Sequence, residues 1–310
     1  MSQTTNTILM IRPINFRMNE QTAVNNYFQE DLNIKNAEIN AKAQEEFDAF
    51  VEKLVAVGVE VIVVQDEKSV DTPDSIFPNN WVSFHKNGNV VIYPMFAENR
   101  RRERREDIFL RLEAEGFKIE NIIDYTSAED QGLFLEGTGS LLLNRDSSKV
   151  YCALSARADE DLVIEFCEDF DCMPVIFTAN QTVDGKRLPI YHTNVMMCLA
   201  EEFSVICLDA IDDKQERKNV IKHLKADKKA IIEISEAQMH QFAGNMLQVQ
   251  GRDEKRFLVM SKAAHESLTP KQIAHIERFC PIVSSSLETI ETCGGGSARC
   301  MMAEVFLPRV

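Results

Sequence analysis

The sequence GGGSARC occupies residues 294–300 and is followed by the apolar run MMAEVF at residues 301–306. Three consecutive glycines are unfavourable inside a helix or strand because of their backbone entropy, but they let the backbone approach a ligand closely. Cys300 then stands at the start of a predicted strand, which makes it a candidate nucleophile if the fold brings a suitable histidine to it. The alternative is a glycine-rich terminal loop with an incidental buried cysteine.

Polar loops like the one before Cys300 recur at nearly equal intervals along the chain. Asn80 and Glu136 are 56 residues apart, and Glu136 and His192 are again 56 apart. The interval from His192 to Gly244 is 52 residues, and that from Gly244 to Cys300 is 56. Five units of similar length predict a closed α/β array with pseudo-five-fold symmetry, in which equivalent positions face one axial pocket.

Apolar and β-branched runs indicate the strands within these units, and helical spacing of apolar residues indicates the helices. Strands are expected at 7–12, 59–64, 81–85, 89–93, 117–123, 140–144, 150–154, 173–177, 195–199, 204–208, 230–234, 246–250, 256–260 and 282–284, and helices at 38–57, 98–115, 159–170, 213–226, 236–242 and 270–279. The first strand is expected to pair with the strand after Cys300, since each otherwise lacks a partner. No linker rich in Gly, Pro or Ser divides the chain, so residues 1–310 are predicted to form one domain.

Composition limits the classes of partner. The chain has 45% apolar and 27% charged residues, as soluble globular proteins do. Its 34 basic and 49 acidic residues give a net charge of −15, which disfavours nucleic acids and membranes as partners. Eight irregularly spaced cysteines predict neither a disulfide framework nor a metal site, and with no signal-like start they favour a cytoplasmic protein. Homo-oligomers remain possible.

The most highly charged segment is ENRRRERRED at residues 98–107. Glu and Arg side chains at helical spacing are typical of a solvated helix face with paired charges. The less favoured interpretation is an anion-binding patch.

Cys300, His192 and Glu136 have a natural division of labour if they meet in one pocket. The thiolate attacks, the imidazole transfers protons to the leaving group and from water, and the carboxylate fixes the orientation and tautomer of the ring. Each residue alone is weak evidence, because a single histidine in a loop is more often a surface or structural residue. Their equal spacing favours the catalytic interpretation.

Four further residues are candidates for substrate binding. Asn80 and Asn194 lie in the same loops, and an amide can both donate to and accept from a planar head group, whereas a carboxylate only accepts. Arg157 and Arg12 could hold a substrate carboxylate through two parallel hydrogen bonds. The alternatives are turn or capping roles for the asparagines and structural ion pairs for the arginines.

Five motifs together resemble the signature loops of the guanidino-group-modifying superfamily of arginine metabolism, which includes arginine deiminases, dimethylarginine dimethylaminohydrolases and glycine amidinotransferases. They are FPNNW at 77–81, LEGTG at 135–139, HTN at 192–194, GNML at 244–247 and GGGSARC at 294–300. The resemblance implies the pentein fold, a five-bladed α/β propeller. It also implies that Cys300 is the nucleophile, His192 the general acid and base and Glu136 its partner, that Phe77 lies at the substrate, and that no metal or other cofactor takes part.

The sequence departs from the arginine deiminase pattern at two loops where those enzymes supply a carboxylate to the substrate guanidinium. Asn80 and Asn194 stand there, and a buried cation without counter-charges is strongly disfavoured. The motifs thus resemble more closely the citrulline-utilization hydrolases, which are loosely called amidinotransferases. The predicted reaction is hydrolysis of the ureido group of citrulline or a close analogue to ornithine, ammonia and carbon dioxide.

Two other functions stay open. Asp74, six residues before Asn80, could supply one carboxylate, which would favour a deiminase or amidinotransferase acting on a guanidine. A non-catalytic protein that binds amino acids is the third possibility. Residues 15–36 and 178–189 are candidates for a lid, because a carbamoyl enzyme must be shielded from other nucleophiles.

Overall fold

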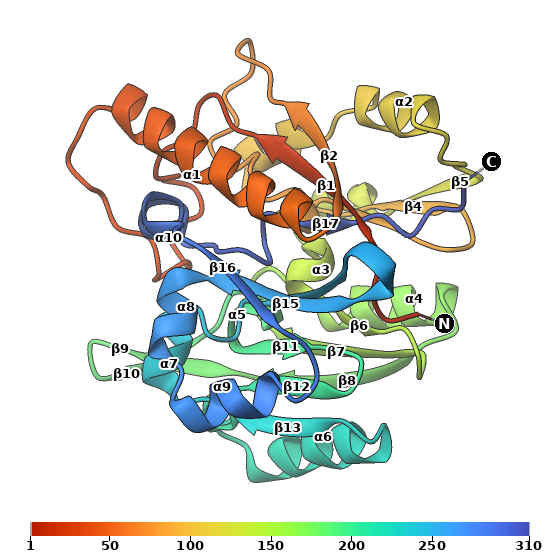
Figure 1. The fold of residues 1–310 in the computed structure, drawn as a ribbon, viewed down its shortest axis with the longest axis vertical. Helices are drawn as coiled ribbons and strands as arrows, with labels where there is room; N and C mark the ends of the chain where they lie inside the picture. The colour runs from red at the N-terminus through yellow and green to blue at the C-terminus, as the bar shows by residue number, and fades with distance from the viewer. Residues whose placement is uncertain (1, 310) are drawn as a thin grey trace.

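The computed structural model describes residues 2–309 and contains five three-stranded sheets (Figure 1). They are β17-β1-β2 (Ala303–Glu304, Thr7–Arg12, Glu60–Gln65), β3-β4-β5 (Val82–Phe84, Asn89–Ile92, Asn121–Asp124), β6-β7-β8 (Leu142–Asn144, Lys149–Leu154, Met173–Thr178), β11-β12-β13 (Met197–Leu199, Phe203–Ile206, Ala230–Glu233) and β14-β15-β16 (Leu247–Gln250, Arg256–Ser261, Ile282–Ser285).

Every one of these sheets has the same topology. Its first strand, in the orders given, is antiparallel to the middle strand, and the third is parallel to it. The expected pairing of the first strand of the chain with the strand after Cys300 is confirmed, since Ile8 pairs with Glu304 and Leu9 with Ala303. The chain thus returns at its end to the sheet in which it began.

Helices connect the strands and cover the sheets. They are α1 (Asn36–Ala56), α2 (Asp107–Ala114), α3 (Gly137–Ser140), α4 (Glu160–Asp169), α5 (Thr193–Met196), α6 (Lys214–Ala226), α7 (Glu236–Met239), α8 (Lys262–Ser267), α9 (Pro270–Ile276) and α10 (Glu288–Gly294), with short 3-10 helices η1 (Pro78–Asn80), η2 (Glu98–Glu103), η3 (Thr126–Gln131), η4 (Leu208–Ala210) and η5 (Arg252–Glu254).

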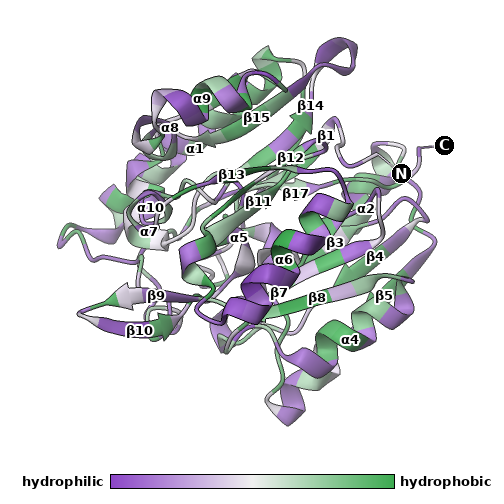
Figure 2. Ribbon diagram, turned by 90° about the horizontal axis from the view of Figure 1, so that it is seen from below, coloured by the Kyte–Doolittle hydropathy of each residue, from purple (hydrophilic) through white to green (hydrophobic). Residues whose placement is uncertain are grey.

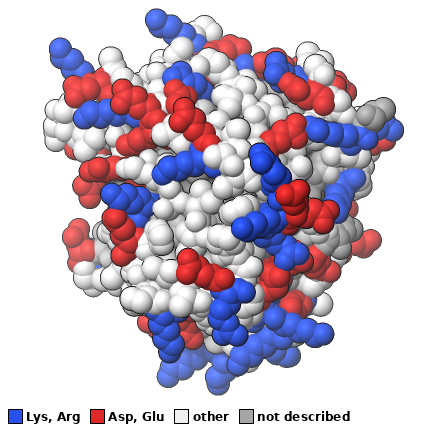
Figure 3. All heavy atoms as spheres, in the orientation of Figure 1, with Lys and Arg blue, Asp and Glu red and all other residues white. Residues whose placement is uncertain are grey.

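Hydrophobic periodicity explains how the longest helix is placed. The buried residues of α1 are Ile39, Ala43, Phe47, Phe50 and Leu54, which recur every three or four positions along one face. They pack with Ile8 and Met10 of β1 in one continuous core cluster. Hydrophobic residues likewise concentrate on strands such as β8 and β15, whereas the outer helix α6 is mainly hydrophilic (Figure 2). The face of the molecule seen in Figure 3 mixes acidic and basic side chains, with basic ones gathered at its lower edge.

The predicted elements differ from the structure mainly in the loops. The helix expected at 98–115 is divided into η2 and α2, and the strand expected at 117–123 forms later, at β5. One-turn helices α3 and α5 and the 3-10 turn η1 were not predicted; they directly follow or contain Glu136, His192 and Asn80. The candidate lid 178–189 is a hairpin of β9 (Asn180–Val183) and β10 (Lys186–Pro189).

Gly137 provides a test of how tightly the site loops are packed. Its φ is +42°, and a Cβ at this position would lie 2.4 Å from the backbone oxygen of Asn79. We expect Gly137→Ala to reduce the free energy of unfolding by more than about 2 kcal/mol, because a clash adds to the backbone strain of about 1–2 kcal/mol. Gly132→Ala is the control, since φ is +72° there but the space is open. Urea unfolding that shows equal losses for both variants contradicts this account.

Candidate active site

Glu136 and His192 form a buried hydrogen-bonded pair at the ends of two loops. Glu136 immediately precedes α3 and His192 immediately precedes α5, and Nε2 of the ring lies 2.7 Å from Oε2 of the carboxylate. The second carboxylate oxygen accepts the backbone N–H of Phe96 at 3.1 Å. The structure therefore brings together two of the three predicted catalytic side chains.

Burial and neighbouring charges set the protonation of this pair. Burial lowers the pKa of His192 to about 4, although Glu136 acts in the opposite direction. Burial opposes ionisation of Glu136, but Arg157 and then the hydrogen bond to His192 lower its pKa to about 2. At neutral pH the pair is thus a carboxylate that accepts a hydrogen bond from Nε2–H of a neutral imidazole, which leaves Nδ1 free to take a proton.

The glycines of the LEGTG loop let Asn80 approach this histidine. A Cβ on Gly139 would lie 2.5 Å from Nδ2 of Asn80 and 2.9 Å from Nδ1 of His192. Both atoms therefore border the same small space, which only a residue without a side chain leaves open. Asn80 comes from η1 and Gly139 from α3, so two loops 59 residues apart meet here.

Cys300 lies between two asparagine amides. Its Sγ accepts from Nδ2 of Asn194 at 3.5 Å and from Nδ2 of Asn245 at 3.2 Å. Asn245 is itself anchored, because its Nδ2 also donates to the backbone oxygen of Asn194 and its Oδ1 accepts the N–H of Arg299. Asn194 is two residues from His192. The turn that carries His192 therefore also carries an amide that donates to Sγ of Cys300. Among the described residues, no hydrogen bond joins the ring of His192 directly to Sγ.

Asn245 was not predicted as a site residue. Its position gave a signal, because it adjoins Gly244 in the fourth of the equally spaced loops, but an asparagine there has no chemical feature that marks it as a site residue.

Two other cysteines lie in the core. Burial raises the pKa of the thiols of Cys152 and Cys198 to about 12. Those two cysteines belong to the hydrophobic core clusters, as expected from the sequence.

The glycine loop before Cys300 packs closely against Phe77. A Cβ on Gly294 would lie 2.8 Å from the ring of Phe77, and one on Gly296 would lie 2.9 Å from it. The hydroxyl of Tyr191 donates to the backbone oxygen of Gly295, which ties this loop to the residue beside His192. The structure therefore places Phe77 beneath the loop that carries Cys300.

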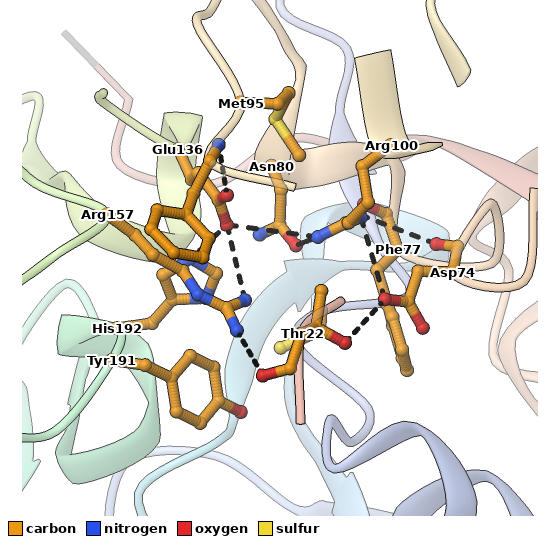
Figure 4. A network of polar contacts seen from close by, with 12 residues as sticks. Thr22, Asp74, Phe77, Asn80, Met95, Arg100, Glu136, Arg157, Tyr191 and His192 are labelled. Carbon is orange, nitrogen blue, oxygen red and sulfur yellow. Dashed lines mark hydrogen bonds and ion pairs between the residues drawn. The ribbon is translucent and has the colours of Figure 1, made fainter. Parts of the chain in front are cut away.

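The buried arginine Arg100 adjoins the Glu136–His192 pair (Figure 4). It donates to Oδ1 of Asn80 at 2.8 Å and to both oxygens of Glu103 at 2.8 and 2.9 Å. It also lies 3.8 Å from a carboxylate oxygen of Asp74 and 3.8 Å from one of Glu136. Burial opposes the charge of Arg100, but Glu103 and the neighbouring carboxylates raise its pKa.

These contacts correct the interpretation of the charged segment 98–107. It was expected to be a solvated helix face, yet Arg100 is 2% and Glu103 is 3% exposed. The guanidinium of Arg100 and the carboxylate of Glu103 pair with each other in the interior of the protein. Only neighbours such as Arg102 and Glu106 are exposed. Sequence alone gives no sign of which charged residue in such a run turns inward.

The two arginines expected to hold a substrate carboxylate have different places. Arg157 is buried in the cluster, where its Nη1 lies 3.5 Å from Oε2 of Glu136 and its Nη2 donates to the backbone oxygen of Thr22. Arg12 is not brought to the site. Its guanidinium makes an exposed bidentate ion pair with Asp48 of α1, so the structural alternative applies to it.

A segment from the candidate lid 15–36 covers the cluster. Asn19 donates to Oδ2 of Asp74 at 2.7 Å, Asn25 accepts from Arg157, and Asn26 donates to the backbone oxygens of Gly294 and Gly295. The other candidate, the β9–β10 hairpin, instead uses Arg187 to bind Asp212 and Glu236. With Cys300 only 3% exposed, the site is closed in this structure.

Within residues 2–309 no group of three or more His, Cys, Asp or Glu side chains is arranged to hold a metal ion. None of the helices in that range combines the length and apolar character required to span a membrane.

Several solved structures share this fold. ArgZ, an arginine dihydrolase from the ornithine-ammonia cycle in cyanobacteria, superposes on 98% of the chain with a TM-score of 0.74 and 18% identity, and the chain spans 41% of ArgZ. Its N-terminal domain, solved as a cysteine-to-serine variant bound to substrate, matches 97% of the chain and 99% of that domain, with a TM-score of 0.68 and 19% identity. A dimethylarginine dimethylaminohydrolase in an adduct with S-methyl-L-thiocitrulline gives 0.61, with 16% identity over 96% of the chain and 98% of its own.

These likenesses show a mixed α/β fold of the pentein type. The chain belongs to the family described as N,N dimethylarginine dimethylhydrolase, eukaryotic, whose model matches residues 12–307, and this membership places it in the guanidino-group-modifying superfamily. A search of curated proteins finds no match.

The lowered pKa of His192 predicts how stability depends on pH. The folded protein binds this proton more weakly than the unfolded chain, whose ordinary pKa is 6.5. The resulting stability, at most about 3 kcal/mol, is therefore complete above pH 6.5 and is lost as the pH falls towards 4. Glu136 adds a second loss only between pH 4.5 and about 2.

His192→Gln tests this assignment, because the glutamine amide can still donate to Glu136 but does not titrate. Urea unfolding at a series of pH values is expected to show a smaller loss between pH 6.5 and 4 in the variant. Some loss remains, since burial also lowers the pKa of His85. An unchanged slope means that His192 is not held neutral by the fold.

Proposed function

We propose that the protein is a cysteine-dependent C–N hydrolase that acts on the ureido group of citrulline or a close analogue. The proposal assigns Cys300 as nucleophile, His192 as general acid and base, and Glu136 as the group that orients the ring. Asn80, Asn194 and Phe77 are proposed to border the substrate head group. Family membership supports a hydrolase of this class, and the charge of the site supports the choice of substrate.

The observation that carries the ureido proposal is that the protein's own arginines already match the carboxylates of the site. Arg100 and Arg157 face Asp74, Glu103 and Glu136. Burial raises the pKa of Asp74, and it raises that of Glu103 to about 8, so one of these two carboxyl groups keeps a proton near neutrality. The cluster then carries no net charge and has no spare counter-charge for a guanidinium. A neutral ureido group of the same shape fits it better.

In the proposed reaction the thiol of Cys300 gives its proton to Nδ1 of His192, and Sγ attacks the ureido carbon. The bond from that carbon to the side-chain nitrogen breaks, His192 gives this nitrogen a proton, and ornithine leaves. The carbamoyl group on sulfur is then attacked by water that His192 deprotonates. The thiolate is released with carbamate, which decomposes to ammonia and carbon dioxide. Ionised Glu136 stabilises the imidazolium that forms in each half of the cycle.

One observation favours a second candidate, hydrolysis of the guanidino group of arginine. Oδ1 of Asp74 is buried and has no hydrogen-bond partner among the described residues, which is unusual for a carboxylate. A guanidinium N–H directed at this oxygen would satisfy it. The fold neighbours include an arginine dihydrolase bound to substrate and AgrE bound to L-arginine, which agrees with this alternative.

We infer in addition that the five sheets are the blades of the predicted propeller and that residues 1–310 form a single catalytic domain. Two backbone hydrogen bonds support ring closure, because they join the fifth sheet to the first unit: Gln250 N–H to the oxygen of Thr5, and Arg252 N–H to that of Val57. Like the arginine dihydrolase solved with its substrate and AgrE solved with L-arginine, the proposed enzyme binds a small amino acid.

A competition assay tests the substrate. The purified protein is incubated with equimolar citrulline and arginine, and the products are identified by mass spectrometry. We expect ornithine from citrulline with arginine unchanged, because the neutral cluster disfavours a cation. Cys300→Ala is expected to abolish turnover while its unfolding curve stays close to that of the wild type. A variant that still forms ornithine would sink the nucleophile assignment.

Asp74→Asn separates the two candidates if both amino acids react. A ureido group needs no counter-charge, so citrulline turnover is expected to fall by less than about tenfold, equivalent to 1.4 kcal/mol. Loss of arginine turnover by about a hundredfold or more, with consumption of arginine by the wild type, shows instead that Asp74 pairs with a guanidinium.

A further inference from the structure

A cavity of about 360 Å³ lies away from the cluster just described. Asn80 precedes β3 and Gly139 precedes β6, whereas His85 and Arg145 follow the opposite ends of the same two strands. The cavity is therefore at the other end of these strands, and it is also lined by residues of α4 and of the turn between α4 and β8. The residues that define its character are His85, Leu143, Arg145, Phe166, Phe170 and Cys172.

Arg145 is a half-buried cation in this cavity without a carboxylate of its own. Its guanidinium lies 3.9 Å from the ring centre of Phe306, and among the described residues it makes no hydrogen bond or ion pair. Glu304 is the carboxylate that affects it most, but Glu304 is already paired with Arg299 at 3.0 Å. Burial lowers the pKa of Arg145, the opposite of the effect of partners on Arg100.

The other charged groups of the cavity are engaged or at its rim. Lys149 is paired with Asp227 at 2.5 Å, and Asp169 accepts the hydroxyl of Tyr125 at 2.5 Å. Lys86 and Asp171 are exposed. The ring of His85 is bonded through Nε2 to Ser83 at 2.8 Å. Among the described residues, Arg145 is therefore the charged group in the interior of the cavity that has no counter-ion.

One wall of the cavity is aromatic. Phe166 and Phe170 of the α4 region stack with ring centres 4.5 Å apart and an angle of 18°, and the ring of His85 lies 4.5 Å from Phe170. Phe170 is only half-buried, so part of this apolar surface faces the open space. Pockets that combine an apolar wall with one directed charge are typical of small organic ligands.

We propose that this cavity is a second binding site, for a small carboxylate with a flat apolar body, whose carboxylate pairs with Arg145 and whose body lies against Phe170. A guanidinium binds a carboxylate through two parallel hydrogen bonds, and the aromatic wall removes the apolar part from water. A phosphate dianion fits less well, because Arg145 is the one guanidinium among the lining residues, Asn144 and Lys149 already donate to Asp227, and Lys86 is exposed. The proposal is independent of the reaction at Cys300.

The test uses the full-length protein and benzoate as the probe, followed by isothermal titration calorimetry. Benzoate is expected to bind saturably at one site, and Arg145→Gln is expected to weaken it by about tenfold or more through loss of the charge-assisted pair. Arg111→Gln, in an exposed helical pair with Glu115, is the matched control and is expected to bind like the wild type. Ureido hydrolysis by both variants is expected to stay near the wild-type rate.

A second variant and a neutral ligand test the proposal if Arg145→Gln is unstable. Phe170→Ala leaves Arg145 intact and is expected to weaken benzoate several-fold without changing the binding of acetate, which has no flat body. Neutral benzamide is expected not to bind. Absence of benzoate binding to the wild type, equal binding by Arg145→Gln, or tighter binding of inorganic phosphate overturns the proposal.

Discussion

The buried charge of Glu136 is the constraint on which the rest of the site depends. A carboxylate that is 0% exposed is strongly disfavoured unless other groups compensate it, and breaking such a pair typically costs about 3–5 kcal/mol. Here His192, Arg157 and the more distant Arg100 supply the compensation. Because each of these three comes from a different loop, the charge of one side chain fixes the relative positions of several units of the fold.

The loops that carry the site residues can meet because glycines stand where these loops approach one another closely. At Gly137 and Gly139 the absence of a Cβ lets the second unit touch the backbone of Asn79 and the side chains of Asn80 and His192. One-turn helices then reverse the chain into short strands, so that the polar residue before each turn points inward. Packing of this kind explains why the site residues occur at equal spacing, since they occupy equivalent positions in repeated units.

The sequence predicted the repeat, most strands, the pairing of the first strand with the last, and the Glu136–His192 pair. Those features depend on spacing and hydrophobic pattern, which are properties of the chain itself. It did not predict that Arg100 and Glu103 turn inward, because burial of a charged residue is decided by partners such as Asp74 that are distant in sequence. Arg12 shows the converse. It was a candidate for the site, but it forms an ion pair with Asp48 on the neighbouring helix α1 and does not reach the site.

Arg157 links the covering of the site by the segment with Thr22 and Asn25 to the compensation of the buried charge of Glu136. Its guanidinium contacts Glu136 on one side and accepting oxygens of Thr22 and Asn25 in the covering segment on the other. Moving that segment away therefore removes acceptors from a buried cation, which must then find others. If the substrate is an amino acid, as we propose, its carboxylate can take their place, whereas water solvates Arg157 without forming a specific ion pair with it. On this proposal, the contacts that close the site also favour its opening when an anionic group is present to replace them.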